Sequence, residues 1–401
     1  TLRVHFSDGA HVDVCKEHLW NAWRANQSVK VIGGKGKRVS GEASQRTVDT
    51  TTLLKWLTAS NDAIASGGKT SRRPLIPVTL PCDFNKDAKQ AFPTYLTGLM
   101  LGDGCMTTKG ISLANGDEYI QDYVENLTPE VTVGTRPEWN AKHYGFTGKF
   151  REDYVSYLNS LGLIGTYSHT KFIPKVLLED RYELLRGLLD TDGTVNKAGN
   201  IYYYTTSKQL SEDVRTLALS LGCTVTLTNK VGKYKKDDGT VVDCKVCYNV
   251  RIKSKSPEKL FNLPRKRDKV KVPQGVYREI VDIEVRDAQL MRCITVSGDH
   301  GLYVCTNDFI VTHNSELLTM VPCLYADDKY YRGIFFRRKY DEIMGANGLW
   351  QKGEGMYPLF DAKSNISNKV WKFPTGARQE FRHMYTEDEK ESHRGKGYSF
   401  V

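Results

Sequence analysis

Two nine-residue stretches in the middle of the chain are copies of one another. Leu96–Gly104 reads LTGLMLGDG and Leu185–Gly193 reads LRGLLDTDG, and they align without a gap with identity at the first, third, fourth, eighth and ninth positions. Their apolar residues follow helical spacing rather than alternation. A duplication constrains the fold strongly, because each copy needs an equivalent structural setting. We therefore expect residues 84–265 to form a duplicated α/β unit.

A second pair of similar segments lies farther along. YVSYLNSLGLIGT and DVRTLALSLGCTVT each predict an amphipathic helix that ends at a Leu-Gly pair, with Gly162 and Gly222 as helix stops. We interpret these two helices as equivalent elements of the two halves.

Each copy of the nine-residue motif ends in Gly-Asp-Gly, which places Asp103 and Asp192 at corresponding positions. Small residues such as Gly98 and Gly187 would let the two helices approach closely, so that the aspartates meet at one end of the pair. Two adjacent carboxylates repel unless a cation lies between them, and Mg²⁺ prefers such oxygen ligands. This arrangement can activate water for phosphodiester cleavage. The alternative is a pair of ordinary helix ends, which the ungapped duplication disfavours.

The charge of the chain favours a polyanionic partner. The formal net charge is +10 and the pI is about 9.0. Basic residues concentrate between Asn229 and Val272, in NKVGKYKK and KSKSPEKLFNLPRKRDKVKV. We expect nucleic acid to bind there, with a merely solvated surface as the alternative. No apolar run is long enough to predict a membrane span.

The cysteines indicate a reducing setting. Nine of them are scattered along the chain, an odd number that predicts free thiols and a cytoplasmic location. Cys244 and Cys247 form a CxxC, but they lie in an alternating run that predicts the second strand of a hairpin. Residues three apart on a strand point to opposite faces, so we interpret this pair as structural.

Both nine-residue copies resemble the signature of the LAGLIDADG homing endonucleases. The resemblance implies two αββαββα halves in one monomer, forming a saddle that binds double-stranded DNA, with Asp103 and Asp192 holding catalytic Mg²⁺. Lys171, in TKFIPKVLL, resembles a family lysine that would steady charge or orient water beside the cleaved phosphate; a surface lysine is the alternative. The first copy departs from the signature at Leu101 and Gly102, outside the metal-binding position.

The border of a strand-rich region carries a further motif. FIVTHNSELLTM places His313, Asn314 and Ser315 between an apolar strand and a predicted helix. One interpretation is a helix N-cap, which both Asn and Ser favour. Together with MRCITVSGDHGLYVCTND before it, however, the stretch resembles the C-terminal splicing region of inteins. The resemblance implies a mostly-β splicing domain of the Hint type, made of residues 1–80 and 266–314 and split by the endonuclease.

The intein resemblance implies roles for several residues and requires no cofactor for splicing. Ser315 would accept the acyl group, Asn314 would cyclise and release its own C-terminal bond, and His313 would assist that cleavage. His18, in VCKEHLW, resembles the histidine that activates the N-terminal scissile bond, although Cys15 stands where the family usually has Thr. Cys293, in RCITV, matches a position proposed for acid-base assistance. A strand-end histidine and a buried thiol are the respective alternatives. Because the chain begins at Thr1 without the N-terminal nucleophile, we expect splicing itself to be disabled.

Residues 315–401 then predict part of the interrupted host protein. GIFFRRKYDEI and PTGARQEFRHMYTEDEKESHRGKGYSFV resemble the ATPase domain of phage terminase large subunits. The resemblance implies an ATP- and Mg²⁺-binding P-loop that splicing would complete, with Ser315 as its last member; an unrelated P-loop ATPase is the alternative. The predicted fold is therefore α+β and multidomain. Two other functions stay open: a packaging ATPase fragment with an inactive insertion, and a DNA-binding protein that does not cut.

Overall fold

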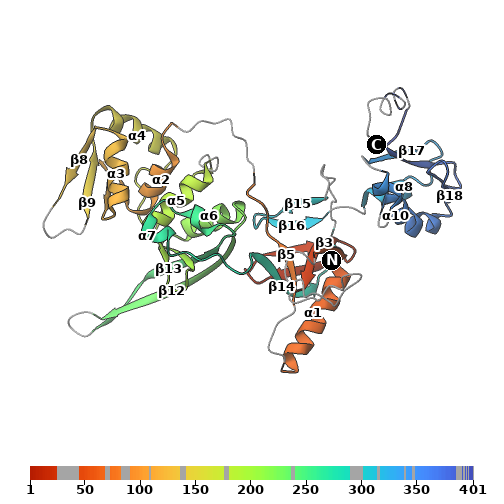
Figure 1. Cartoon of the computed structure of the whole chain (residues 1–401), viewed down its shortest axis with the longest axis horizontal. Helices are drawn as coiled ribbons and strands as arrows, with labels where there is room; N and C mark the ends of the chain where they lie inside the picture. Colours follow the sequence, from red (N-terminus) through yellow and green to blue (C-terminus); the bar gives the residue numbers. More distant parts are fainter. Residues whose placement is uncertain are drawn as a thin grey trace. The chain divides into compact units, whose positions relative to one another are not determined.

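The computed structural model describes residues 1–24, 45–67, 73–82, 91–107, 110–135, 141–175, 180–235, 240–289, 301–313, 317–337, 340–345, 348–384, 391, 393, 395 and 397–400. The chain divides into two compact units, Thr1–Gln289 with Val304–Thr312 and Leu290–Tyr303 with His313–Val401 (Figure 1). None of the helices in these ranges is both long and apolar enough to cross a membrane.

The first unit contains the predicted duplication. Its first half runs through α2 (Thr94–Gly102), β6 (Gly104–Thr107), β7 (Gly110–Asn115), α3 (Glu118–Leu127), β8 (Val131–Gly134), β9 (Lys142–Phe146) and α4 (Gly148–Ser160). The second half runs through α5 (Arg181–Thr191), β10 (Gly193–Val195), β11 (Ile201–Thr205), α6 (Lys208–Ser220), β12 (Thr224–Lys235), β13 (Val241–Lys253), η3 (Pro257–Leu260) and α7 (Pro264–Arg267). Each half has one antiparallel sheet, ordered β6-β7-β9-β8 and β10-β11-β13-β12. The order of strands is the same, so the duplicated α/β unit is confirmed.

The predicted equivalence of the two helices that end in a Leu-Gly pair is wrong. The two helices that end in Leu-Gly are α4 and α6, and both glycines adopt the left-handed backbone of a helix stop, with φ of +73° at Gly162 and +79° at Gly222. However, α4 follows the second hairpin of its half, whereas α6 lies between the two hairpins of the other half. The structural counterpart of α6 is α3. The shared Leu-Gly ending reflects the requirements of a helix stop rather than a shared place in the repeat.

Both halves contribute to a single hydrophobic core. Side chains of α2 and α5 lie at its centre, and residues of all four hairpins pack on them. Figure 1 shows the two sheets in yellow and green on either side of the two helices. Each sheet therefore buries one face, and the residues that alternate with the buried ones lie on the other.

The segments before and after the duplicated unit pair with each other. They form an eight-stranded sheet in the order β15-β16-β3-β5-β14-β1-β2, with β4 attached to β3. The strands are β1 (Leu2–Phe6), β2 (His11–Val14), β3 (Leu19–Arg24), β4 (Arg46–Asp49), β5 (Pro74–Pro77), β14 (Tyr277–Val285), β15 (Leu302–Cys305) and β16 (Ile310–His313), and α1 (Thr50–Ala65) packs against them. Leu2 lies opposite Val285, and Tyr277 lies opposite Pro77. The duplicated unit is thus an insertion within one flanking sheet.

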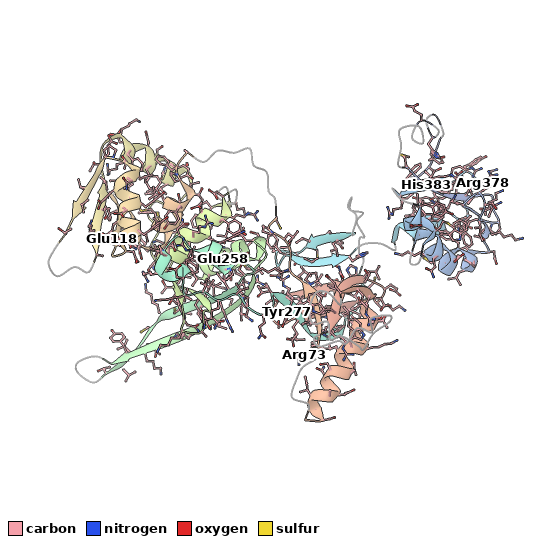
Figure 2. The ribbon with its side chains drawn as sticks, in the orientation of Figure 1. Arg73, Glu118, Glu258, Tyr277, Arg378 and His383 are labelled. Atoms are coloured by element: carbon pink, nitrogen blue, oxygen red, sulfur yellow. The ribbon has the colours of Figure 1, made fainter. Side chains whose placement is uncertain are left out.

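A buried ion pair ties the flanking sheet together. Arg278 on β14 pairs with Asp8 at 2.8 Å, and both side chains are almost fully buried. The same guanidinium donates to the carbonyl of Asp308, in the turn between β15 and β16. Figure 2 labels two further contributors, Arg73, which pairs with Glu279 at 3.2 Å, and Tyr277, which packs edge-on against Trp23.

The second unit has its own core and a four-stranded sheet, ordered β17-β20-β19-β18. Its elements are α8 (Leu317–Leu324), β17 (Arg332–Arg337), α9 (Asp341–Met344), α10 (Leu349–Met356), η4 (Tyr357–Phe360), β18 (Lys363–Asn365), β19 (Val370–Lys372) and β20 (Arg378–His383). The expected helix after Ser315 and the strands in GIFFRR and GARQEFRHM are confirmed as α8, β17 and β20. β17 and β20 run parallel, and the hairpin β18–β19 was not predicted.

Candidate active site

The two motif helices, α2 and α5, contact each other through glycine residues. A Cβ atom on Gly98 of α2 would lie 2.9 Å from the Cα of Gly187 on α5 and 2.6 Å from the carbonyl oxygen of Leu184. Real Cβ atoms do not approach backbone so closely, so only glycine allows this helix contact. The prediction that small residues bring the two helices together is confirmed.

The two motif aspartates occupy the same position at the ends of these helices. Asp103 is the C-cap of α2 and Asp192 the C-cap of α5, with nearly identical backbone angles. Both side chains reach solvent. The pKa of Asp192 is nevertheless raised to about 6, first by burial against the surrounding protein and then by the charge of Asp103. The structure therefore brings the two predicted ligands into one electrostatic site.

The two aspartates differ in their support. Asn115, at the end of β7, donates from Nδ2 to Oδ2 of Asp103 at 2.7 Å, and its own Oδ1 accepts from the amide of Asp117. This bond opposes the effect of burial, which raises the pKa of Asp103. In the second half Thr205 holds the corresponding place and accepts from Ser207 instead. Among the described residues, the Asp192 carboxylate accepts no hydrogen bond. Asn115 was missed from the sequence, because only the fold brings β7 to the helix end.

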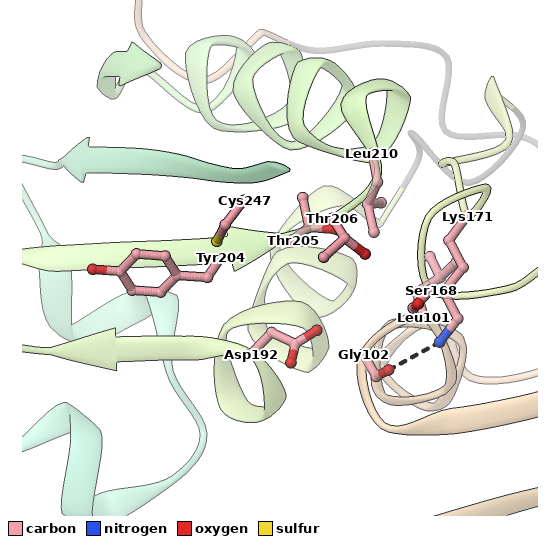
Figure 3. A pocket seen from close by; sticks show the side chains of 10 residues that line it. All are labelled: Leu101, Gly102, Ser168, Lys171, Asp192, Tyr204, Thr205, Thr206, Leu210 and Cys247. Atoms are coloured by element: carbon pink, nitrogen blue, oxygen red, sulfur yellow. Dashed lines mark hydrogen bonds between the residues drawn. The ribbon is translucent and has the colours of Figure 1, made fainter. Parts of the chain in front are cut away.

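A cavity of about 310 Å³ opens beside Asp192. Figure 3 shows the Asp192 carboxyl at the end of α5 and Lys171 reaching the end of α2, with strand residues Tyr204 and Cys247 on the other side. The cavity is polar where it faces the carboxyl and is formed by both halves. It offers room for a group of about the size of a phosphodiester next to the Asp192 carboxylate.

Lys171 is not a surface lysine, so that alternative is wrong. It is 6% exposed, and its ammonium donates to the carbonyls of Met100 at 3.2 Å, Gly102 at 2.9 Å and Gly104 at 2.9 Å. Burial lowers the pKa of Lys171, while the charges of Asp192 and Asp103 oppose that shift. All three of its donors are used at the C-terminal end of α2, where a positive charge is favourable.

Lys266 is the counterpart of Lys171 in the second half, and the sequence did not single it out. It is also 6% exposed, and it donates to the carbonyls of Leu189 at 2.9 Å, Asp190 at 2.7 Å and Thr191 at 3.1 Å. Burial lowers its pKa to about 8. It stands in a run of basic residues, and it follows its Leu-Pro pair whereas Lys171 precedes Ile-Pro. The reversed order hides the equivalence from a sequence alignment.

The departure of the first motif copy at Leu101 has a structural reason. The corresponding residue of the second copy, Asp190, accepts from the Tyr95 hydroxyl at 2.8 Å and from the amides of Asn262 and Leu263. Asp190 thereby fixes the segment that leads to Lys266. Leu101 is buried and takes no such role. The sixth position of the motif is structural in the second half and apolar in the first.

Metal binding at this site would depend on two carboxylates. Within the described ranges, no group of three His, Cys, Asp or Glu side chains lies together. Mg²⁺ commonly uses one or two carboxylates and completes its shell with water and phosphate oxygens. Asp103 and Asp192 fit that role, since they are coupled like charges with raised pKa values and Asp192 has a free acceptor face among the described groups. The CxxC residues lie on β13, as expected, and Cys247 lines the cavity.

The flanking sheet places one residue of the second predicted site, His18, against the residue that precedes His313. His18 lies just before β3, and its Nε2 makes a short hydrogen bond with Oγ1 of Thr312 on β16. The His18 ring also packs edge-on against Trp20. His313 follows Thr312, and its pKa is lowered to about 4 by burial, so its imidazole is neutral at pH 7. Cys293, Asn314 and Ser315 lie outside the described residues.

Comparison with known families identifies the second half of the duplicated unit. Residues 179–261 match the family described as a LAGLIDADG-like domain. This half of the unit is therefore similar to LAGLIDADG-like domains, in agreement with the resemblance stated from the sequence.

Curated relatives and solved structures show similarity over part of the chain. The chain is 27% identical over 241 residues to a replicative DNA helicase DnaB of Mycobacterium intracellulare, covering 58% of this chain and 36% of the helicase. A replicative DNA helicase DnaB of Nostoc sp. is 30% identical to the chain over 214 residues, covering 46% of this chain and 23% of the helicase. The chain thus spans about a third and about a quarter of these two relatives. A crystal structure of I-DmoI in complex with DNA and Ca covers 44% of this chain and 94% of its own, with 13% identity and a TM-score of 0.28.

Proposed function

We propose that the duplicated unit is a divalent-metal-dependent endonuclease that cuts double-stranded DNA at a specific site. The observation that carries the proposal is the pairing of Asp103 and Asp192 at the ends of two glycine-packed helices, each leading into an equivalent sheet. Two buried lysines stand beside them. The match of residues 179–261 to a LAGLIDADG-like domain supports the same function.

The residues of the chain prepare the site in three ways. Asn115 orients Asp103, while Asp192 keeps its oxygens available for a ligand. Lys171 and Lys266 hold positive charge at the two helix ends, where a DNA phosphate would bring negative charge. The cavity beside Asp192 accepts the phosphodiester. When bound between the carboxylates, a divalent cation would lower the pKa of water and stabilise the leaving oxygen.

Cleavage of a plasmid library with randomised inserts tests this proposal. The full chain with Mg²⁺ should linearise a subset of plasmids that share one sequence. Asp103→Asn and Asp192→Asn should each lower cutting at least about 100-fold, because each removes a charged ligand from the reacting centre. Asp153→Asn, an exposed change on α4, serves as the matched control and should cut normally.

The rival functions give different results in the same experiment. A DNA-binding protein that does not cut would retain plasmids without linearising any of them. An inactive insertion would neither retain nor cut. Cutting that survives both aspartate changes would show that the paired carboxylates are not the reacting centre.

We also propose that the flanking sheet is an intein splicing domain, with residues 1–80 and 266–314 as its two parts. The pairing of β1 and β5 with β14 and the hydrogen bond of His18 to Thr312 support this proposal. His18 would activate the N-terminal scissile bond, and Cys293 would assist proton transfer. His313, neutral at pH 7, would assist Asn314, and Ser315 would accept the acyl group.

Residues 315–401 would then belong to the interrupted host protein. The parallel pair β17 and β20, with α8 before it, supports an α/β domain. We retain the terminase-like ATPase as the proposed host, with Ser315 completing an ATP- and Mg²⁺-binding P-loop. Similarity to two helicases over only part of each protein supports an element shared between different hosts. The cytoplasm remains the proposed location, and the nuclease is proposed to act as a monomer.

A further inference from the structure

The strand registers allow the two sheets of the duplicated unit to be compared position by position. Ser112 lies opposite Gly145 in the first sheet, and Tyr202 lies opposite Arg251 in the second. Two residues farther along the strands, Ala114 lies opposite His143 and Tyr204 lies opposite Asn249. On the outer hairpins, Thr132 corresponds to Thr226 and Gly134 to Thr228.

These positions all lie on the face that turns away from the core. On the inner strands, the residues between them are fully buried, namely Leu113 and Tyr144 in the first sheet and Tyr203 and Val250 in the second. On the edge strand β8, Val133 is 45% exposed. Since side chains alternate along a strand, the compared residues form the outer face of each sheet. This is the face that the proposed function presents to DNA.

The two outer faces differ greatly in what they offer a base pair. In the first sheet, the outer residues are small, apart from His143: Cys105, Ser112, Ala114, Thr132, Gly134 and Gly145. In the second sheet the corresponding positions hold two tyrosines, an asparagine, an arginine and three threonines. A glycine or alanine offers no side-chain donor or acceptor, whereas arginine matches the edge of guanine and asparagine that of adenine.

Arg251 is held in place for such a role. Its Nη2 donates to Oδ1 of Asn200 at 3.0 Å, and its guanidinium lies 5.9 Å from the centre of the Tyr202 ring. Tyr204 packs parallel to Tyr202. Among the described residues, Nε of Arg251 and Oδ1 of Asn249 are buried and have no hydrogen-bond partner. The contacts with Asn200 and Tyr202 orient the guanidinium of Arg251.

The second sheet also extends farther. β12 and β13 have 12 and 13 residues, whereas β8 and β9 have 4 and 5. Figure 1 shows the long hairpin in green, continuing past the rest of its sheet. Its strands carry six basic residues and one acidic residue, Asp243; the basic residues are Lys230, Lys233, Lys235, Lys245, Arg251 and Lys253. The second half can therefore contact a longer stretch of phosphates.

We propose that recognition of the DNA target is asymmetric, and that the half-site under the second sheet carries most of the sequence discrimination. Arg251 reads a guanine there, with Asn200 and Tyr202 holding its guanidinium. The first sheet follows the duplex through shape and backbone and tolerates base changes. This inference rests on the proposed function, because it assumes that the outer faces meet DNA.

Selection of bound duplexes from a library randomised at every position tests the inference. The full chain is used with Ca²⁺ in place of Mg²⁺, and the retained duplexes are sequenced. We expect the base preferences to lie mainly on one side of the centre of the site. Arg251→Ala should reduce the preference for guanine at one position of that side roughly 10- to 100-fold. His143→Ala, at the largest outer residue of the first sheet, should change no position as strongly.

Arg251→Lys separates reading from folding and from simple charge. The lysine keeps the charge but lacks the planar pair of donors, so affinity for random duplex should persist while the guanine preference falls. Equal base preferences on both sides of the centre would overturn the inference. So would an Arg251→Ala effect that is uniform over all positions, which would mark a phosphate contact. If no duplex is retained at all, the proposed function itself fails.

Discussion

At the scale of single residues, the site is built from charges that are paired across the repeat but supported differently. Asp103 and Asp192 were predicted because the duplication marks them in the sequence. Asn115 and Lys266 were not, because their partners are backbone and side-chain atoms far away in the chain. Such contacts exist only once the sheets and helices have packed. A repeated motif therefore predicts the reacting groups better than it predicts the groups that hold them.

Lys266 illustrates how a supporting residue can be tested. Replacing it by Met should leave three helix-end carbonyls without their donor and should lower the free energy of unfolding by about 1–3 kcal/mol. Cutting should fall as well, since Asp192 directly follows these carbonyls. Urea unfolding monitored by circular dichroism would measure the loss. Lys269→Met, at an exposed neighbouring position, is the control, and equal stability of both variants would contradict a capping role.

At the scale of helices and strands, the sequence predicted which segments are helical or extended. It did not predict correctly which helices of the two halves are equivalent. The motif helices and the Leu-Gly helix stops were found. The equivalence of α4 and α6 was wrong, because similar helix ends recur wherever a helix must stop. The great length of β12 and β13 compared with β8 and β9 was not expected either. Strand length depends on what a strand pairs with, and local sequence carries little information about that.

The contact between α2 and α5 gives the prediction that belongs to this scale. Gly98→Ala places a Cβ against the backbone of α5, where no side chain can move aside. We expect a loss of about 1–3 kcal/mol in the free energy of unfolding and a larger fall in cutting, because separating the helices also separates the aspartates. Thermal unfolding and plasmid cleavage would be measured together.

Gly110→Ala is the matched control for that change. A Cβ atom at Gly110 would meet no atom within 4 Å. It should leave both stability and cutting near those of the original chain. If Gly98→Ala behaved like this control, the close approach of the two helices would not be needed to position the site.

At the scale of the whole molecule, the chain carries two candidate chemistries on separate cores. The core of the duplicated unit and the core of the flanking sheet are distinct clusters, although β14 follows directly after the duplicated unit. The pairing of β1 with β14 means that the flanking sheet can form only after both segments around the insertion are present. The resemblance to inteins implied this split, because it assigns residues 1–80 and 266–314 to one domain.

Separate cores predict that the two chemistries can be removed independently. If the side-chain amide of Asn314 attacks its own carbonyl carbon, the bond to Ser315 breaks, a succinimide forms and Ser315 is released with a free amine. Mass spectrometry of the incubated chain should then detect a fragment of residues 315–401. Asn314→Ala should abolish that fragment and leave DNA cutting unchanged, whereas Asp192→Asn should abolish cutting and leave the fragment. His313→Ala should slow release by roughly 100-fold or more, within the range for loss of a general acid or base. Release that continues in Asn314→Ala would assign the cleavage to other chemistry, and loss of both activities in either variant would show that the two parts depend on one another.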